Sequence, residues 1–206
     1  MVHTDSMHVK TRKAEQSEAT RAALLSAGRE LFAAQGFAAT STEQIVQHAR
    51  VTRGALYHHF KDKADLFAAV FEELSHEVGD QVRAGSKAGG DRGTWGHLLA
   101  GCNAFLDACL QPEVRQIVLL DAPAALGWER WRELDAKCGF ALMKMGLEVA
   151  MGANLIARQP LEPLAHILVG ALNEAALAMV RAEDPAAARA EIGVSVERLL
   201  EGLRAS

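Results

Sequence analysis

The chain has 206 residues, of which half are hydrophobic and 5% are aromatic, and its formal net charge is −4. Alanine and leucine dominate and β-branched residues are scattered, which favours an all-α fold over a sheet. The sequence contains no run of 18 apolar residues and no apolar segment near its start, so we expect neither a membrane span nor a signal peptide. The three cysteines lack metal-ligand spacing, which fits a reduced, cytoplasmic location.

Charge is unevenly divided along the chain. Residues 1–63 carry a net charge of +3, and the remaining residues carry −7. A basic head on an acidic body indicates a polyanionic partner for the head only, although many globular proteins show such asymmetry by chance.

The first predicted elements are a flexible arm and a helix. Residues 1–16 are polar and lack periodicity, so we expect a mobile N-terminal arm. Residues 18–35 repeat apolar side chains at helical spacing, with Ser17 as a plausible N-cap. Gly36 follows the last turn, where a left-handed residue commonly ends a helix.

Three further helix starts carry capping residues. Ser41 and Gln44 have the spacing of a capping box, and Thr52 and Asp62 are suitable N-caps. We therefore expect helices at 42–49 and 53–59, and a long helix that opens at Lys63.

The rest of the chain is predicted to be helical as well. The long helix keeps an apolar stripe from Phe67 to Val82, and residues 85–93 form a glycine-rich linker. Further helices are expected at 94–110, 113–120, 128–151, 161–182 and 185–203. The expected domains are an arm (1–16), a helix-turn-helix domain (17–64) and a ligand-binding and dimerisation domain (65–206).

Residues 37–66 have the pattern of a helix-turn-helix, in which two short helices are joined by a tight turn. The apolar positions that fix the helix crossing are Ile45, Ala49, Val51, Leu56 and Phe60. The outer face of the second helix then carries Arg53, Tyr57 and His58, and the small Gly54 permits close approach to a groove.

Each outward side chain has a suitable DNA contact. Arg53 can fork onto a guanine edge, Tyr57 can reach a phosphate or a thymine methyl, and His58 can donate to phosphate or base. Thr40, Ser41 and Lys63 lie at helix starts, where phosphates are favoured. Two other interpretations stay open: Tyr57 as half-buried packing, and His58 with His59 as a metal pair, which adjacent helical positions disfavour.

The segment resembles the DNA-binding domain of the TetR (tetracycline-repressor-like) family of bacterial regulators. The matching residues are Leu31, Phe32, Gly36, Phe37, Thr40, Ser41, Ile45, Ala49, Val51, Thr52, Gly54, Leu56, Tyr57, His59, Phe60, Lys63 and Leu66. The resemblance implies phosphate contacts by Thr40 and Lys63, groove contacts by Thr52, Arg53, Gly54, Tyr57 and His58, and a C-terminal ligand pocket with a dimer interface.

One position departs from the family pattern, which usually has glycine in the turn where this chain has Arg50. If the position is left-handed, a side chain there costs about 1–2 kcal/mol. Either the turn is reshaped or Arg50 offsets the strain through a phosphate contact.

The C-terminal part offers a candidate ligand pocket lined by aromatic, methionine and other apolar side chains. The candidates are Trp95, Leu98, Cys102, Phe105, Trp128, Trp131, Met143 and Met145. The alternative for each of them is ordinary core packing. Cys102 and Cys109 lie two helical turns apart, about 10.5 Å, which is too far for a disulfide.

Two apolar stripes on the last helices indicate a four-helix bundle with a second copy, or else intramolecular core packing. Their members are Leu164, Leu168, Ala171, Ala175, Met179, Ile192, Val196, Leu199 and Leu203. A dimer places two reading helices about 34–36 Å apart and matches a palindromic operator on double-stranded DNA.

The sequence thus predicts a DNA-binding repressor that acts as a homodimer and is released by a small apolar effector. The alternatives are an activator, and a protein of the same fold that has no ligand. No catalytic motif and no metal motif is found, so we expect neither an enzyme nor a cofactor.

Overall fold

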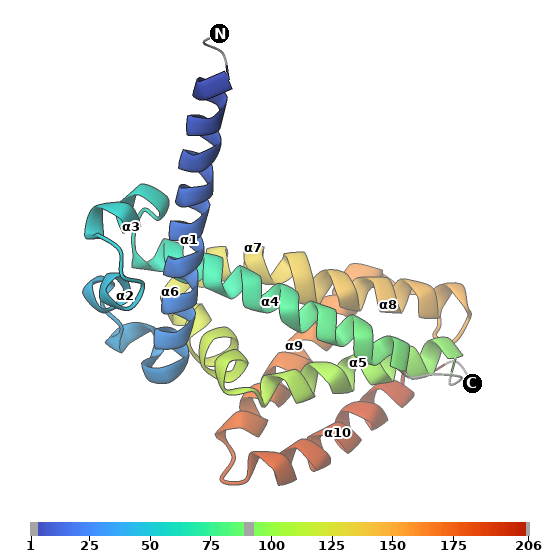
Figure 1. Ribbon diagram of the computed structural model, residues 1–206. Coiled ribbons are helices and arrows are strands. Elements are labelled where there is room, and N and C mark those ends of the chain that lie inside the picture. Colours follow the sequence, from blue (N-terminus) through green and yellow to red (C-terminus); the bar gives the residue numbers. More distant parts are fainter. Residues whose placement is uncertain (1–3, 89–92, 205–206) are drawn as a thin grey trace. The chain divides into compact units, whose positions relative to one another are not determined.

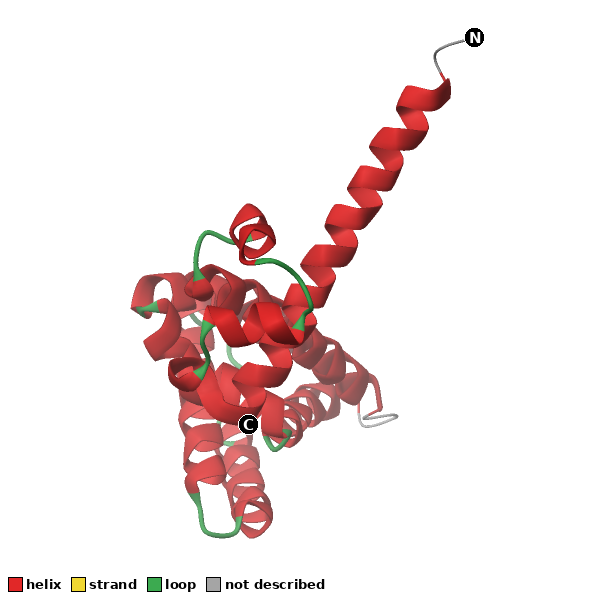
Figure 2. Ribbon diagram, turned by 60° about the vertical axis from the view of Figure 1, so that its left-hand side comes forward, coloured by secondary structure: helices red, strands yellow, loops and turns green. Residues whose placement is uncertain are grey.

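The computed structural model describes residues 4–88 and 93–204, with side chains from residue 14 onward. Within these ranges the chain is helical and has no strand, apart from an isolated antiparallel bridge between Ile156 and Arg204 (Figures 1 and 2). The all-α prediction is confirmed. The chain divides into two compact units, Met1–Phe71 and Glu72–Ser206, and the boundary falls inside one long helix.

The first unit is built around an apolar core of fully buried side chains. Phe32 and Phe67 are 0% exposed, and their ring centroids lie 5.1 Å apart in an edge-on arrangement. Leu24, Ile45 and Leu56 are equally buried, and Phe60 is 4% exposed, so three of the predicted inward positions lie in the core, whereas Ala49 and Val51 are only partly buried. The helices of this unit are α1 (Thr4–Ala39), α2 (Thr42–His48), α3 (Arg53–His59) and the start of α4 (Lys63–Ala88).

Helix α1 is longer than its predicted span. It begins at Thr4, so Ser17 lies inside the helix and is not its N-cap. The predicted end at residue 35 is confirmed, because the next residue, Gly36, has a non-helical backbone with φ 80° and ψ 165°. Residues 4–16 are therefore helical, and the mobility of this arm stays a prediction.

The second unit contains the remaining helices and two π-helical segments. Helix α9 packs against both α8 and α10, and α5 packs against α8, α9 and α10. The elements are α5 (Gly93–Cys109), η2 (Val114–Asp121), α6 (Ala122–Leu126), α7 (Trp128–Asp135), η3 (Ala136–Phe140), α8 (Ala141–Gly152), α9 (Leu161–Arg181) and α10 (Pro185–Glu201).

Three predicted features of this part of the chain differ from the structure. The single helix expected at 128–151 is split by the wider π-helical turn η3, and the helix expected at 113–120 is itself π-helical. The linker expected at 85–93 is shorter, because α4 continues to Ala88 and α5 starts at Gly93. Residues 89–92 of that linker lie outside the described residues.

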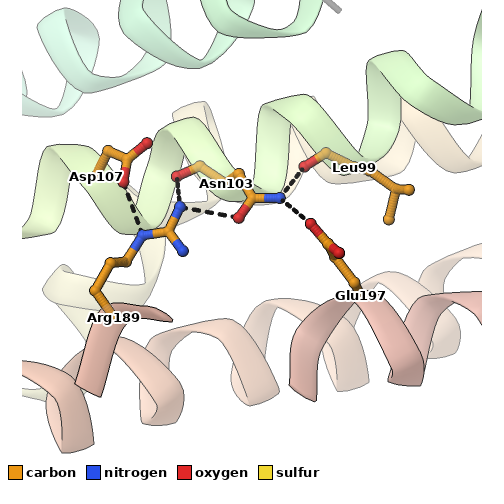
Figure 3. A network of polar contacts seen from close by, with 5 residues as sticks. All are labelled: Leu99, Asn103, Asp107, Arg189 and Glu197. Carbon is orange, nitrogen blue, oxygen red and sulfur yellow. Dashed lines mark hydrogen bonds and ion pairs between the residues drawn. The ribbon is translucent and has the colours of Figure 1, made fainter. Parts of the chain in front are cut away.

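A polar network holds α10 against α5 (Figure 3). Arg189 on α10 donates from Nε to Asp107 Oδ1 at 2.7 Å, and from Nη2 to the carbonyl and side-chain oxygens of Asn103 at 3.1 and 2.9 Å. Asn103 Nδ2 in turn donates to Glu197 Oε1 at 3.0 Å and to the Leu99 carbonyl at 3.2 Å. The network fixes two turns of α10 to one face of α5.

Helix α9 is the one described helix long and apolar enough to satisfy a membrane-span criterion, with a mean hydropathy of 1.5 in its most apolar window. Its apolar side chains Leu164, Leu168 and Met179 are buried against neighbouring helices. This burial explains its composition as that of a core helix.

Candidate nucleic-acid interface and effector cavity

The caps predicted for the helix-turn-helix are present. Ser41 Oγ accepts from the Gln44 amide at 3.2 Å, and the Ser41 amide donates back to Gln44 Oε1 at 2.8 Å, which completes the capping box of α2. Thr52 Oγ1 accepts from the Ala55 amide at 3.2 Å and caps α3. Asp62 Oδ1 accepts from the Asp65 amide at 2.8 Å at the start of α4.

The outer face of α3 is open to solvent. Tyr57 is 46% exposed, and Arg53, Gly54 and His58 are exposed as well. Arg53 lies over the Tyr57 ring at 5.6 Å, and hydrogen bonds from Arg53 and then Thr42 lower the pKa of the Tyr57 phenol. Tyr57 is therefore a surface residue held in place by a cation, and the half-buried alternative does not apply.

Thr40 and Lys63 brace the loop between α1 and α2. Lys63 Nζ donates to the carbonyls of Phe37 and Thr40, both at 2.7 Å, and sits 4.1 Å above the Phe37 ring. Thr40 is 2% exposed, and its hydroxyl donates to the Gly36 carbonyl at 2.8 Å. The inward hydroxyl of Thr40 disfavours the direct phosphate contact predicted for it, whereas Lys63 keeps one of its three N–H donors for an outside acceptor.

Arg50 occupies the turn in a left-handed conformation, with φ 55°. Its amide donates to the Gln47 carbonyl at 3.2 Å, and the next amide, that of Val51, donates to the Val46 carbonyl at 3.0 Å. The turn thus has the conformation that glycine adopts without cost, and Arg50 bears the steric strain instead.

The His58–His59 pair does not form a metal site with other ligands. Their rings meet edge-on, with centroids 5.1 Å apart, and no group of three or more histidine, cysteine or acidic residues gathers among the residues that the structure describes.

A cavity of about 440 Å³ lies within the second unit, between α4, α5, η2, η3, α8 and α9. Five of the predicted pocket residues line it: Leu98, Cys102, Phe105, Met143 and Met145. Sequence reasoning missed the rest of its wall, above all Val78, Arg83, Asp135, Cys138 and Leu142.

The three tryptophans predicted to line the pocket are not among the residues that line this cavity. Trp95 is buried elsewhere, with its indole N–H donating to Glu201 Oε1 at 2.6 Å. Trp128 is 69% exposed and packs against Trp131, with ring centroids 5.2 Å apart. The indole N–H of Trp95 thus has a hydrogen-bond acceptor far away in the sequence, and the indole of Trp128 lies at the solvent-exposed surface.

All three cysteines are buried and free of disulfides. Burial raises the pKa of Cys102 and of Cys109 to about 12, and it also raises the pKa of Cys138. These thiols therefore stay protonated at neutral pH, which disfavours thiol chemistry in the cavity.

Four of the nine residues predicted for the dimer stripes are buried by packing within the chain. Leu164, Leu168, Met179 and Val196 are at most 9% exposed, which leaves these four no surface for a second copy. Ala171, Ala175, Ile192 and Leu203 are partly exposed, and Leu199 is 51% exposed. The most open apolar side chain on α9 is Ile167, at 67%, and Val194 on α10 is 49% exposed.

A capped helix-turn-helix with an exposed second helix, followed by a helical unit that contains a cavity, is the architecture of a DNA-binding regulator. Two family models match: bacterial regulatory proteins of the tetR family over residues 24–70, and a tetracyclin repressor-like C-terminal domain over residues 95–203. The chain belongs to the TetR family of transcriptional regulators, which are not enzymes.

Individual relatives agree with this assignment. A TetR-family transcriptional regulator of known structure from Pectobacterium atrosepticum is 34% identical, with a TM-score of 0.81 over 93% of this chain and 97% of that chain. AcrR of Shigella flexneri is 41% identical over 32% of this chain and 31% of its own length, and TtgR of Pseudomonas putida is 38% identical over 37% and 36%. The chain thus matches only about a third of these two curated relatives.

Proposed function

We propose that the protein is a cytoplasmic homodimeric repressor that binds a palindromic operator and is released by a small, largely apolar effector. The observation that carries the proposal is the exposed face of α3, which bears Arg53, Gly54, Tyr57 and His58 on an α-helix, an element that the major groove admits. The family assignment supports the same conclusion.

In this proposal Arg53 and His58 read bases, and Tyr57 reaches a phosphate or a thymine methyl. Ser41 and Thr52 lie at the exposed N-termini of α2 and α3, where backbone amides and the helix dipole favour phosphates. Lys63 donates its third N–H to a DNA phosphate while its other two hold the loop between α1 and α2.

The dimer surface that fits best is the open side of α9 and α10. Ile167, Gly170 and Ala178 are exposed along α9, and Val194 and Leu199 are exposed on α10. Small residues beside large apolar ones allow the close helix approach of a four-helix bundle. Partial exposure of Ala171, Ala175 and Ile192 lets these predicted residues border the same surface.

The cavity supports an effector-controlled protein over one of the same fold that has no ligand. Its volume of about 440 Å³ lies in the range of small-molecule sites, and apolar side chains supply most of its wall. An effector that binds better to the arrangement unable to bind DNA would release the operator.

The experiment is binding of the purified protein to DNA from just upstream of its own gene, followed by fluorescence anisotropy across a salt series. Arg53→Ala is expected to lose sequence discrimination, whereas Arg115→Ala, which removes an exposed arginine on η2, is the matched control. Ile167→Glu is expected to yield monomers in sedimentation, and Ala157→Glu, at an exposed loop position, is not. Equal loss in Arg115→Ala and Arg53→Ala would argue against reading by α3.

A further inference from the structure

The carboxylate of Asp135 is the unusual group in the cavity wall. It is the last residue of α7, lies on the cavity lining and has a side chain 19% exposed. Its Oδ2 atom is buried and has no hydrogen-bond partner among the described residues, and the nearest cation, Arg132 Nη1, is 3.7 Å away. A buried carboxylate oxygen without a hydrogen bond is unfavourable, so a ligand that supplies a donor to this carboxylate would be stabilised.

A glycine lies beside this carboxylate in the cavity wall. Gly139 on η3 also lines the cavity, and a side chain built there would start 3.7 Å from Asp135 Oδ1. The π-helical turn η3 therefore brings a glycine to the side of the carboxylate on which Oδ1 lies. The other π-helical segment, η2, contributes Val118 to the same cavity, and π-helical turns occur frequently at functional sites.

Two other polar side chains of the wall are engaged in hydrogen bonds within the protein. Arg83 donates to Asp80 Oδ1 at 2.6 Å, and the Ser86 hydroxyl donates to the His97 carbonyl at 2.9 Å. The surrounding surface is apolar, with Leu98 and Phe105 from α5 opposite the α4 residues. Asp135 thus offers a hydrogen-bond acceptor on a mostly apolar wall, and Lys87, which is exposed, is the competing site for an anion.

We propose that the effector has an apolar body, one terminal hydrogen-bond donor and no negative charge, and that the donor binds the Asp135 carboxylate. The inference rests on the proposed effector role of the cavity. An ionised carboxylate only accepts hydrogen bonds, so a hydroxyl or an ammonium fits it and a second carboxylate is repelled. Burial raises the pKa of the Asp135 carboxyl, against the opposing effect of Arg132, as expected for a charge that lacks donors.

Calorimetric titration of the full chain with 1-decanol, decylamine and decanoate tests the proposal without DNA, so its failure is distinguishable from failure to bind an operator. At least one of decanol and decylamine is expected to bind about tenfold or more tighter than decanoate. The probe that binds identifies the donor as a hydroxyl or an ammonium. Ethylamine, which lacks the apolar body, is expected not to bind.

Asp135→Asn is expected to lower affinity for the bound probe about tenfold while the variant melts no earlier than wild type, because a largely buried charge with no hydrogen bond to Oδ2 has been removed. Glu133→Gln, which removes an exposed charge from the same helix outside the cavity lining, is the control and should bind like wild type. Tighter binding of decanoate, no binding by any ten-carbon probe, unchanged affinity in Asp135→Asn, or an earlier melt of that variant would overturn the proposal.

Discussion

Arg50 holds a left-handed backbone conformation, with φ 55°, in the turn between α2 and α3. A side chain in that region costs about 1–2 kcal/mol, whereas glycine adds about 0.5–1 kcal/mol of conformational entropy to lose on folding. Arg50→Gly is therefore expected to stabilise the protein by about 0.5–1 kcal/mol, seen as a higher midpoint in thermal denaturation followed by circular dichroism.

Arg50→Ala is the matched variant, because alanine keeps the backbone strain and removes only the guanidinium. It is expected to leave the melting temperature within the small range of a surface change. If Arg50 also contacts a phosphate, both variants reduce the slope of log affinity against log salt by about one. An Arg50→Gly variant that melts no higher than Arg50→Ala refutes the strain argument.

Three further perturbations follow from the contacts. Lys63→Ala removes two carbonyl contacts from a partly exposed ammonium, and is expected to cost about 1–2 kcal/mol in chemical denaturation, whereas the exposed Lys61→Ala should stay near wild type. Arg189→Ala breaks the bonds to α5 and is expected to cost about 1–3 kcal/mol, with the exposed Arg198→Ala as its control; equal losses would contradict the network. Because its folded pKa is raised, Asp135 binds protons more readily in the folded state, so its cost to stability grows as pH rises above the ordinary aspartate range. The stability advantage of Asp135→Asn should therefore shrink as pH falls toward 4, and a pH-independent difference would refute the raised pKa.

The helix-turn-helix was predictable because the residues that determine it are close together in the sequence. The capping box of Ser41 and Gln44, the Thr52 cap and the helix break at Gly36 each depend on residues within a few positions. Their spacing is visible in the sequence, and the structure confirms them. The bracing role of Lys63 was missed, because its partners lie 23 and 26 residues away in the chain.

The second unit, Glu72–Ser206, was less predictable because its contacts are long-range. Trp95 is a residue type that often lines ligand pockets, yet its indole N–H donates to Glu201, 106 residues away in the sequence. The split of the predicted helix at η3 has no sequence signal that periodicity detects, and that split positions Gly139 beside Asp135. Likewise, an apolar stripe on α9 fits core or dimer packing equally, and only burial distinguishes Leu168 from Ile167.

The most direct test of the central claim is selection of binding sites by the purified protein from a randomised duplex DNA pool at low salt. The account predicts enrichment of an inverted repeat whose half-sites are centred about 10–10.5 base pairs apart or at a multiple of that spacing. Enrichment should disappear in Arg53→Ala and persist in Arg115→Ala. A wild-type protein that enriches no sequence from the pool would contradict reading of an operator by α3.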